Sequence, residues 1–302
     1  MSQCFRNVYI SCFVAYGMVL ESLFNPFRVK KKPYEMFLAG LLYTVVGMML
    51  SYFVFREIAG ILMVFLVVLA TVPLLYITII HEEELDLKYS REIVLLKEHT
   101  KVLLFLICLF LGITTAFVGA YILLPSDVSH TLFELQEQAI INVNTYVQGS
   151  ITGGIALSSI FSKIFVNNLK VLFFCLVFSL LYGTGAIFIL TWNASVIGAA
   201  MGSLIKKEIA ITAAAVGWGS LVSYFGVASF SFFRYMTHGL FEIAAYFLAG
   251  LAGGIISIAI IKHNLQKEQV FIDALDLILI SLLLLFVGGI VEVYITPALF
   301  PT

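Results

Sequence analysis

The sequence predicts an all-α, polytopic helical membrane protein with about seven transmembrane helices plus amphipathic or re-entrant half-helices. Of its 302 residues, 61% are hydrophobic and only 12% are charged, and the mean hydropathy is +1.06. Soluble domains carry roughly 25% charged residues, so this chain has too few to cover a water-exposed surface. These values exclude a water-soluble enzyme, a nucleic-acid-binding protein and a disordered chain.

Seven stretches contain the roughly 20 largely apolar residues that a bilayer crossing needs. They are Met36–Phe55, Ile58–Ile80, Val102–Leu124, Val166–Leu190, Ile209–Phe233, Thr237–Ile261 and Ala274–Leu299. Only Arg56 and Glu57 separate the first two stretches, which predicts a tight helical hairpin. Pro73 predicts a kink inside the second stretch, and Pro125 ends the third.

Three shorter apolar stretches predict helices that do not cross the membrane. Val8–Leu20 is too short to cross alone, and we expect an interfacial or half-inserted helix. Leu132–Val147 repeats apolar residues at helical spacing between acidic and amide residues, which predicts an amphipathic surface helix. Asn193–Ile205 is rich in Ala and Gly and about half a span long, which predicts a re-entrant helix.

The positions of the basic residues orient this layout, because cytoplasmic loops carry an excess of Lys and Arg. With the N-terminus in the cytoplasm, 4 of the 17 basic residues face outward, namely Arg56, Lys163, Lys170 and Arg234. The inward-facing residues are Arg6, Arg28, Lys30, Lys31, Lys32, Lys88, Arg91, Lys97, Lys101, Lys206, Lys207, Lys262 and Lys267. This bias requires Asn193–Ile205 to re-enter, because a crossing there would turn the three later spans around. We therefore expect a multi-pass plasma-membrane protein with a cytoplasmic N-terminus and an external C-terminus.

A few polar residues lie inside the predicted spans, where a charge costs roughly 2.5–3.5 kcal/mol at the bilayer centre. His238 and Glu242 are four residues apart and share one helical face. Glu292 in the last span and Asn168 in the fourth lie at a similar predicted depth. These four residues form a candidate intramembrane polar cluster. Three interpretations are open: a hydrogen-bonded clamp between helices, a binding or transport pocket, and a hydrolytic site with His238 as the base.

No catalytic residue is assigned, because the sequence contains neither an H-E-x-x-H nor a G-x-S-x-G motif. We therefore expect no enzymatic activity. The sequence also lacks a Cys or His spacing typical of metal sites and a phosphate-binding loop, so we expect no metal and no cofactor. The expected partners are membrane lipids and further copies of the chain, as a homodimer or another homo-oligomer. The sequence does not identify a protein partner in a membrane complex, and we expect no nucleic-acid partner.

Small and capping residues suggest how the predicted helices meet. Asn193 is expected either to cap the half-helix or to contact a lipid phosphate at its N-terminus. The pairs Gly198–Gly202 and Gly250–Gly254 each have the G-x-x-x-G spacing that lets helices approach closely in lipid. They predict either packing within one chain or a dimer seam, for which the sixth span is the best candidate.

Several short motifs follow one another between about residue 142 and residue 299. They are FVNN at 165–168, YGTG at 182–185, WN at 192–193, HGLFE at 238–242, AGLAGG at 249–254 and VEVYITP at 291–297. In their order and spacing the chain resembles the stage II sporulation protein M family, particularly its archaeal members. Ala194 is a departure, since many members have Gly there.

The resemblance implies a helical membrane fold more firmly than it implies a function. The sporulation member is implied to be a scaffold for cell-wall hydrolases. Archaeal relatives have no such hydrolases, and for them membrane remodelling or association with transport systems is implied. We divide the chain into an N-terminal membrane region, 1–130, and a family-like membrane domain, 131–302.

Our leading hypothesis from the sequence is a non-enzymatic integral membrane protein that oligomerises and shapes the bilayer or scaffolds a membrane complex. The three predicted non-crossing helices favour it, because such helices insert into one leaflet. The alternative is a transporter or channel with an intramembrane His/Glu site.

Overall fold

The computed structural model describes residues 33–88, 92–151, 157–182, 184–216, 221–261 and 268–300. These residues form helices and no strands, which confirms the predicted all-α class. The helices are α4 Pro33–Val54, α5 Ala59–Lys88, α6 Glu92–Leu123, α7 Ser126–Ile151, α8 Leu157–Tyr182, α9 Ala186–Val216, α10 Leu221–Ile261, α11 Glu268–Ile290 and α12 Thr296–Leu299. The predicted interfacial helix Val8–Leu20 lies outside the described residues.

Seven helical segments of the described residues are long and apolar enough to cross a membrane, which is the number that the sequence predicts. They are Tyr34–Val54, Arg56–Tyr76, Val102–Leu123, Leu157–Leu181, Ala186–Ile211, Phe232–Ile261 and Val270–Leu299. The predicted hairpin is confirmed, because a single 3-10 turn, Arg56–Ile58, joins α4 to α5. Pro73 lies inside α5.

The predicted fourth span is wrong, because Val166–Leu190 contains the end of α8 and the start of α9. The backbone N–H of Ile187 donates to the carbonyl oxygen of Thr184 over 3.2 Å, so α9 begins with a tight turn. A Cβ atom at Gly185 would overlap the backbone of Phe178. A glycine at this position therefore lets α9 fold back closely against α8.

The predicted re-entrant helix and fifth span are also wrong. Asn193–Ile205 lies within α9, which is long enough to cross the membrane. The stretch Ile209–Phe233 begins in α9 and ends in α10, so it is not one helix. The sequence predicts two spans with a half-helix between them in this region, and the structure has the two helices α8 and α9 instead. Each contains one segment long enough to cross, so the number of candidate crossings before α10 is the same as predicted. Only Lys206 and Lys207 move to the other end of the bundle.

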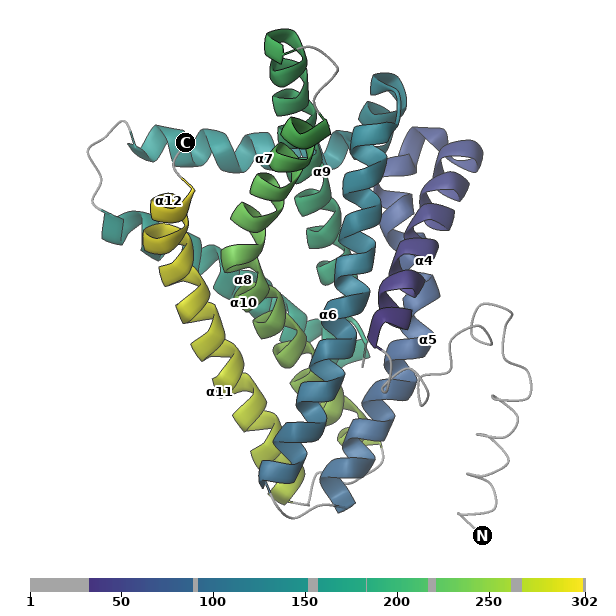
Figure 1. Cartoon of the computed structure of the whole chain (residues 1–302). Helices are drawn as coiled ribbons and strands as arrows, with labels where there is room; N and C mark the ends of the chain where they lie inside the picture. The colour runs from purple at the N-terminus through teal and green to yellow at the C-terminus, as the bar shows by residue number, and fades with distance from the viewer. Residues whose placement is uncertain are drawn as a thin grey trace.

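The amphipathic helix predicted at Leu132–Val147 is confirmed as part of α7, which begins earlier, at Ser126. Figure 1 shows α7 lying across the upper end of the bundle, at a steep angle to α6. The fully buried Gln136 holds it there. Its Nε2 atom donates to the carbonyl oxygen of Gly60 and to Oγ of Ser195, each over 3.2 Å. The amide thus joins α7 to both α5 and α9.

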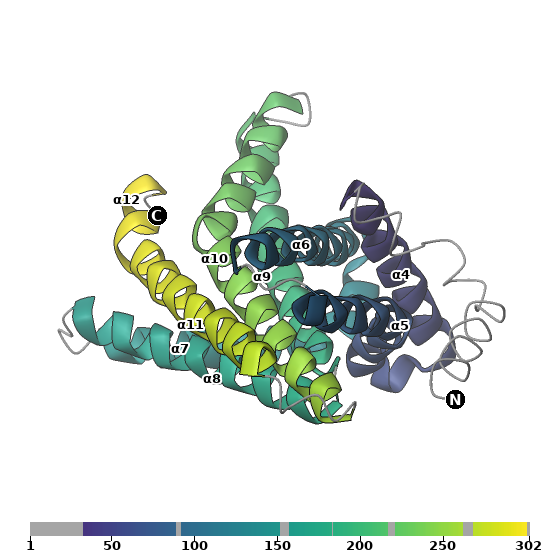
Figure 2. The same ribbon diagram turned by 90° about the horizontal axis from the view of Figure 1, so that it is seen from below.

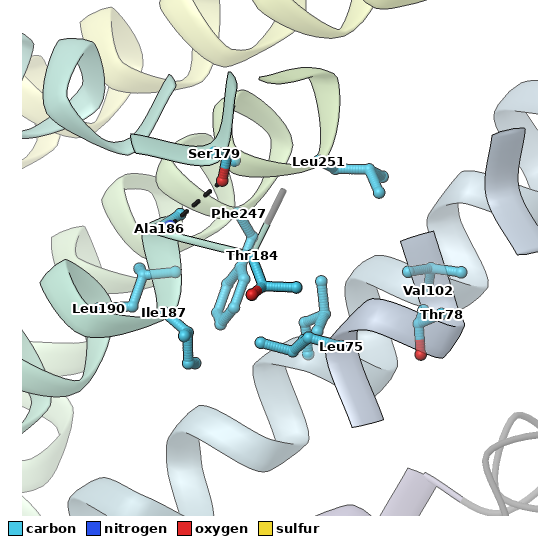
Figure 3. Close-up of a pocket in the computed structure, with 12 residues that line it drawn as sticks. Leu75, Thr78, Val102, Ser179, Thr184, Ala186, Ile187, Leu190, Phe247 and Leu251 are labelled. Carbon is cyan, nitrogen blue, oxygen red and sulfur yellow. Dashed lines mark hydrogen bonds between the residues drawn. The ribbon is translucent and has the colours of Figure 1, made fainter. Parts of the chain in front are cut away.

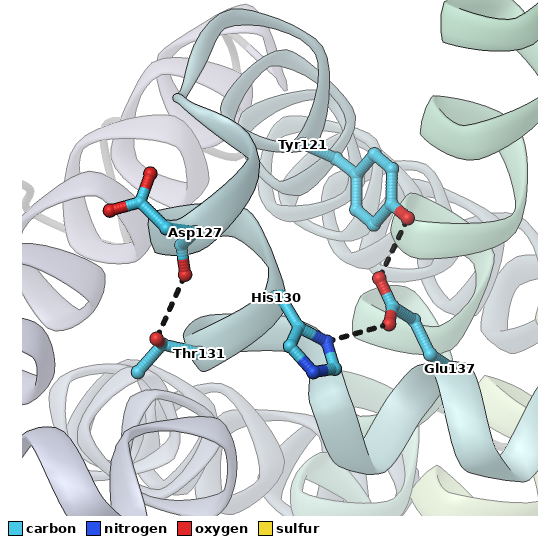
Figure 4. Close-up of polar contacts among 5 residues, drawn as sticks. All are labelled: Tyr121, Asp127, His130, Thr131 and Glu137. Carbon is cyan, nitrogen blue, oxygen red and sulfur yellow. Dashed lines mark hydrogen bonds and ion pairs between the residues drawn. The ribbon is translucent and has the colours of Figure 1, made fainter.

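A second polar contact joins α7 to the end of α6 (Figure 4). The Tyr121 hydroxyl donates to Oε1 of Glu137 over 2.7 Å. Nδ1 of His130 lies 3.1 Å from the other oxygen of the same carboxylate. This carboxylate therefore links two turns of α7 and fixes them to α6.

The helices converge towards the lower end of the bundle and diverge towards the upper end, where α7 and α12 lie (Figure 1). Seen from below in Figure 2, α10 lies between α11 on one side and α5 and α6 on the other. Its crossing segment is 89% buried, against 17% for that of α8. The described fold is thus a tapered bundle with α10 at its centre.

A small cavity of about 30 Å³ lies where five of these helices meet (Figure 3). It is lined by residues of α5, α6, α8, α9 and α10, among them Leu75, Val102 and Phe247. Beside it, Oγ of Ser179 accepts a 3.2 Å hydrogen bond from the backbone N–H of Ala186. This bond satisfies one of the free N–H groups at the start of α9.

The glycine pairs predicted as contact sites pack within the chain. Cβ atoms at Gly198 and Gly202 would lie 2.5 Å from Cβ of Phe117 and 2.6 Å from Cβ of Tyr121, both on α6. A Cβ atom at Gly250 would lie 2.8 Å from Cβ of Ala186, and Gly254 is buried. The helices of this chain therefore occupy the glycine face of the sixth span, which is not free to form the predicted dimer seam.

Candidate intramembrane polar site

Three segments that are far apart in the sequence bring a polar cluster together. They are α8 with Asn168, α10 with Glu242, and the turn after α11 with Glu292. Nδ2 of Asn168 donates to Oε1 of Glu242. The carboxyl groups of Glu242 and Glu292 are hydrogen-bonded to each other. Glu242 thus lies between its two partners and links α8 to α11.

A π-helical turn, Val291–Ile295, carries Glu292. Pro297 follows it and explains its position, because proline has no N–H group and its ring clashes with the carbonyl four residues earlier. The Thr296 hydroxyl donates instead to the carbonyl oxygen of Val291 over 3.0 Å. Such π turns interrupt α-helices frequently at functional sites.

The close approach of α11 to α10 depends on Gly288. A Cβ atom there would lie 3.3 Å from Cγ of Glu242, tighter than most contacts. Nearby, the rings of Phe161 and Phe165 are stacked with their centroids 5.7 Å apart, and the Phe286 ring contacts both of them edge-on. These rings pack α8 against α11 beside the polar cluster, and hydrogen bonds are stronger in such apolar surroundings.

His238 lies one helical turn from Glu242 on α10, as the spacing predicts. Its Nδ1 atom is 3.3 Å from Oγ1 of Thr296. Because this hydroxyl already donates to a carbonyl, it accepts the hydrogen bond from the imidazole N–H. His238 therefore fixes α10 to the start of α12.

A cavity of about 540 Å³ adjoins the cluster at the upper end of the bundle, and we call it the α10–α12 cavity. Its lining residues are Arg234, Tyr235, His238, Glu292, Thr296, Pro297 and Phe300. Since Glu292 lines the cavity and is bonded to Glu242, the carboxyl pair forms one end of this space. In the part of the chain that the structure describes, no three His, Cys, Asp or Glu side chains gather in a way that could hold a metal ion.

The structure brings together His238, Glu242, Glu292 and Asn168, the four residues of the predicted cluster. Sequence reasoning missed Arg234, Tyr235 and Thr296, which complete the polar lining. A signal for Arg234 was available, because it precedes His238 by four residues just as His238 precedes Glu242.

Asn193 takes no part in this cluster. It lies inside α9, well after the first residue of that helix, Ala186. The predicted cap is therefore wrong. The alternative, a lipid-phosphate contact at a helix N-terminus, is also wrong, because no helix begins at Asn193.

The sequence model of one protein family, described as "Stage II sporulation protein M", matches residues 101–297. This chain belongs to the stage II sporulation protein M family. The match includes Asn168, Glu242 and Glu292, so the whole carboxyl cluster lies inside the family region. The match starts at the beginning of the third span, upstream of the domain 131–302 that we expected from the sequence.

An uncharacterized protein of Methanocaldococcus jannaschii is 30% identical over 145 residues, which cover 45% of this chain and 71% of that protein. No solved structure matches the chain significantly.

Proposed function

We propose that this protein is a non-enzymatic membrane transporter that binds a polar ligand in the α10–α12 cavity and exchanges protons at the Glu242–Glu292 pair. The observation that carries the proposal is a hydrogen-bonded carboxyl pair inside two crossing helices, at the end of a cavity of about 540 Å³. Acidic groups within membrane helices are costly and typical of proton relays and ion pathways. A hydrogen bond between two carboxyl groups contains one proton, which can pass between them.

The lining of the cavity favours binding over catalysis. Its aliphatic hydroxyl, on Thr296, donates to a backbone carbonyl and accepts from His238, so it is not poised to attack a substrate. The remaining polar groups can donate or accept hydrogen bonds and carry charge, which is sufficient to hold and orient a ligand.

Proton flux into liposomes tests the proposal. We expect liposomes containing the purified protein to acidify inside, under an imposed pH gradient, faster than protein-free liposomes. Glu292→Gln is expected to reduce this flux by at least about tenfold, because an amide keeps the hydrogen-bonding shape but cannot release a proton. The matched control is Glu134→Gln on α7, which is exposed and outside the cavity. A wild-type flux no greater than that of protein-free liposomes would contradict the proposal.

We propose a plasma-membrane orientation in which the upper end of the bundle in Figure 1 is external. In this orientation the segment before α4, the adjoining ends of α5 and α6 with their connection, and the α10–α11 connection are cytoplasmic, and they contain 11 of the 17 basic residues. The external residues are Arg56, Lys163, Lys170, Lys206, Lys207 and Arg234. The positive-inside bias is thus retained after α9 is corrected to a full crossing, and the α10–α12 cavity opens on the external side.

Bilayer shaping is a second candidate function, and the tapered outline of the bundle favours it (Figure 1). The amphipathic α7 lies across the wide end, where it would occupy area in one leaflet only. A homo-oligomer would enlarge this effect. Its copies would contact one another through α8, which is poorly buried, and not through α10, which is already buried within the chain. Electron cryomicroscopy of liposomes at increasing protein-to-lipid ratios checks this expectation. Smaller or tubular vesicles would support shaping, and unchanged vesicles at every ratio would exclude it.

A further inference from the structure

We infer that the α10–α12 cavity binds a zwitterionic ligand, with an anionic phosphate or carboxylate group at Arg234 and an ammonium group at Glu292. The inference rests on the proposed function in taking the cavity as a ligand site. It goes further by naming the chemical class of the ligand, from the charges at the two ends of the cavity.

Arg234 supplies the anion-binding end. It lies within the apolar crossing segment Phe232–Ile261, is half-buried and lines the cavity. Among the described residues, no carboxylate forms an ion pair with it. Arg234 is the third residue of this segment, so its guanidinium lies near the membrane interface, where no carboxylate of the described residues occupies it. The planar guanidinium binds both oxygens of a carboxylate or phosphate, and the neighbouring Tyr235 side chain lines the same wall.

The carboxyl pair supplies the cation-binding end. Arg234 and Glu242 are eight residues apart on α10, which corresponds to a rise of about 12 Å along the helix. Glu292 is bonded to Glu242 and lines the cavity, so negative charge lies at the opposite end from the guanidinium. Pro297 and Phe300 provide apolar parts of the cavity wall. The volume of about 540 Å³ falls in the range of small-molecule sites, about 300–1,000 Å³.

The two opposite charges select against simpler ligands. A bare cation entering the cavity passes the positive Arg234, and a bare anion meets the carboxyl pair. A ligand that carries both charges is attracted at both ends, and a wrong charge at either end is rejected. Two sources offer this chemistry: the phosphoethanolamine head group of a membrane lipid, and a water-soluble zwitterion.

The test measures binding of four probes to the full-length protein in nanodiscs of phosphatidylglycerol. The soluble probes are glycerophosphoethanolamine, which carries both charges, glycerol 3-phosphate, which carries only the anion, and ethanolamine, which carries only the cation. The fourth probe is phosphatidylethanolamine added to the nanodiscs. We expect glycerophosphoethanolamine to bind at least about tenfold more tightly than either single-charge probe. If phosphatidylethanolamine abolishes this binding, the lipid head group is the natural source; if it does not, a soluble zwitterion is.

Two variants locate the charges. Arg234→Gln and Glu292→Gln are each expected to weaken glycerophosphoethanolamine binding by about tenfold or more. The controls Arg56→Gln, at the α4–α5 turn, and Glu134→Gln, on α7, should leave it unchanged. Equal binding of the three soluble probes to the wild-type protein overturns the inference, and this comparison does not depend on any variant folding. Proton flux without zwitterion binding would overturn this inference alone, whereas zwitterion binding without flux would overturn only the proposed transport.

Discussion

Glu242→Leu is expected to lower the free energy of unfolding by about 2–4 kcal/mol, the cost of leaving the Asn168 amide and the Glu292 carboxyl without their partner. Asn168 lies within the apolar crossing segment of α8, where water cannot easily replace the lost hydrogen bond, whereas Glu292 also borders the α10–α12 cavity. Leucine has a similar volume but no polar atom. Glu242→Gln is expected to retain most of the stability, because its amide can still accept from Asn168 and donate to Glu292.

Unfolding of the purified protein in mixed micelles, followed by circular dichroism as the denaturing detergent is increased, measures this difference. Glu134→Leu on α7 is the control, because Glu134 is exposed and outside the cluster. If Glu242→Leu unfolds at the same detergent fraction as the wild type, Glu242 does not hold α8 and α11 together. Proton flux of Glu242→Gln then separates a clamp from a pathway: a folded variant with normal flux is a clamp, and a folded variant without flux is part of a pathway.

The first three crossing helices could be predicted from hydropathy, because charged or proline residues mark their ends. Arg56 and Glu57 separate α4 from α5, and Pro125 ends α6. The boundary between α8 and α9 could not be found in this way. The turn near Gly185 has apolar residues on both sides and contains no charge, so a hydropathy window continues through it.

Lys206 and Lys207 explain the wrong prediction of a re-entrant helix, because the positive-inside rule assigns both to the cytoplasmic side. Both lie near the end of an apolar crossing segment, Ala186–Ile211. Long lysine side chains at such a position can reach the interface while their methylene groups stay in lipid. Two lysines are thus weaker evidence for orientation than an uninterrupted helix.

The candidate cluster was predictable in part. The i,i+4 spacing places His238 and Glu242 on one face, and the depth of Asn168 and Glu292 brings them to the same level. Thr296 could not be assigned, because its contact with His238 depends on the π turn before Pro297. The predicted fifth span ends at Phe233, one residue before Arg234, so the sequence places Arg234 in a loop. Its role follows from the true course of α10, which begins at Leu221.

Gly112→Ala is expected to destabilise the protein by about 3 kcal/mol, although alanine is normally the better helix former. A Cβ atom at Gly112 on α6 would overlap the backbone of Phe37 on α4. One at Gly40 on α4 would likewise overlap the carbonyl oxygen of Leu109 on α6. The two backbones are thus in contact at both glycines, and no side-chain rotation can relieve the overlap. To make room for the methyl group, α4 and α6 must move apart, and this separation weakens the packing contacts between the two helices.

Gly119→Ala is the matched control on the same helix, because a Cβ atom there would meet nothing within 4 Å. This substitution is expected to be neutral or to stabilise α6 by up to about 1 kcal/mol. Unfolding of both variants in mixed micelles gives the comparison, and equal shifts would contradict the close contact of α4 with α6. The outcome also bears on how the chain is divided. Because α4 precedes the family-matched residues 101–297, a large loss for Gly112→Ala would mean that the N-terminal helices and the family region fold as one unit.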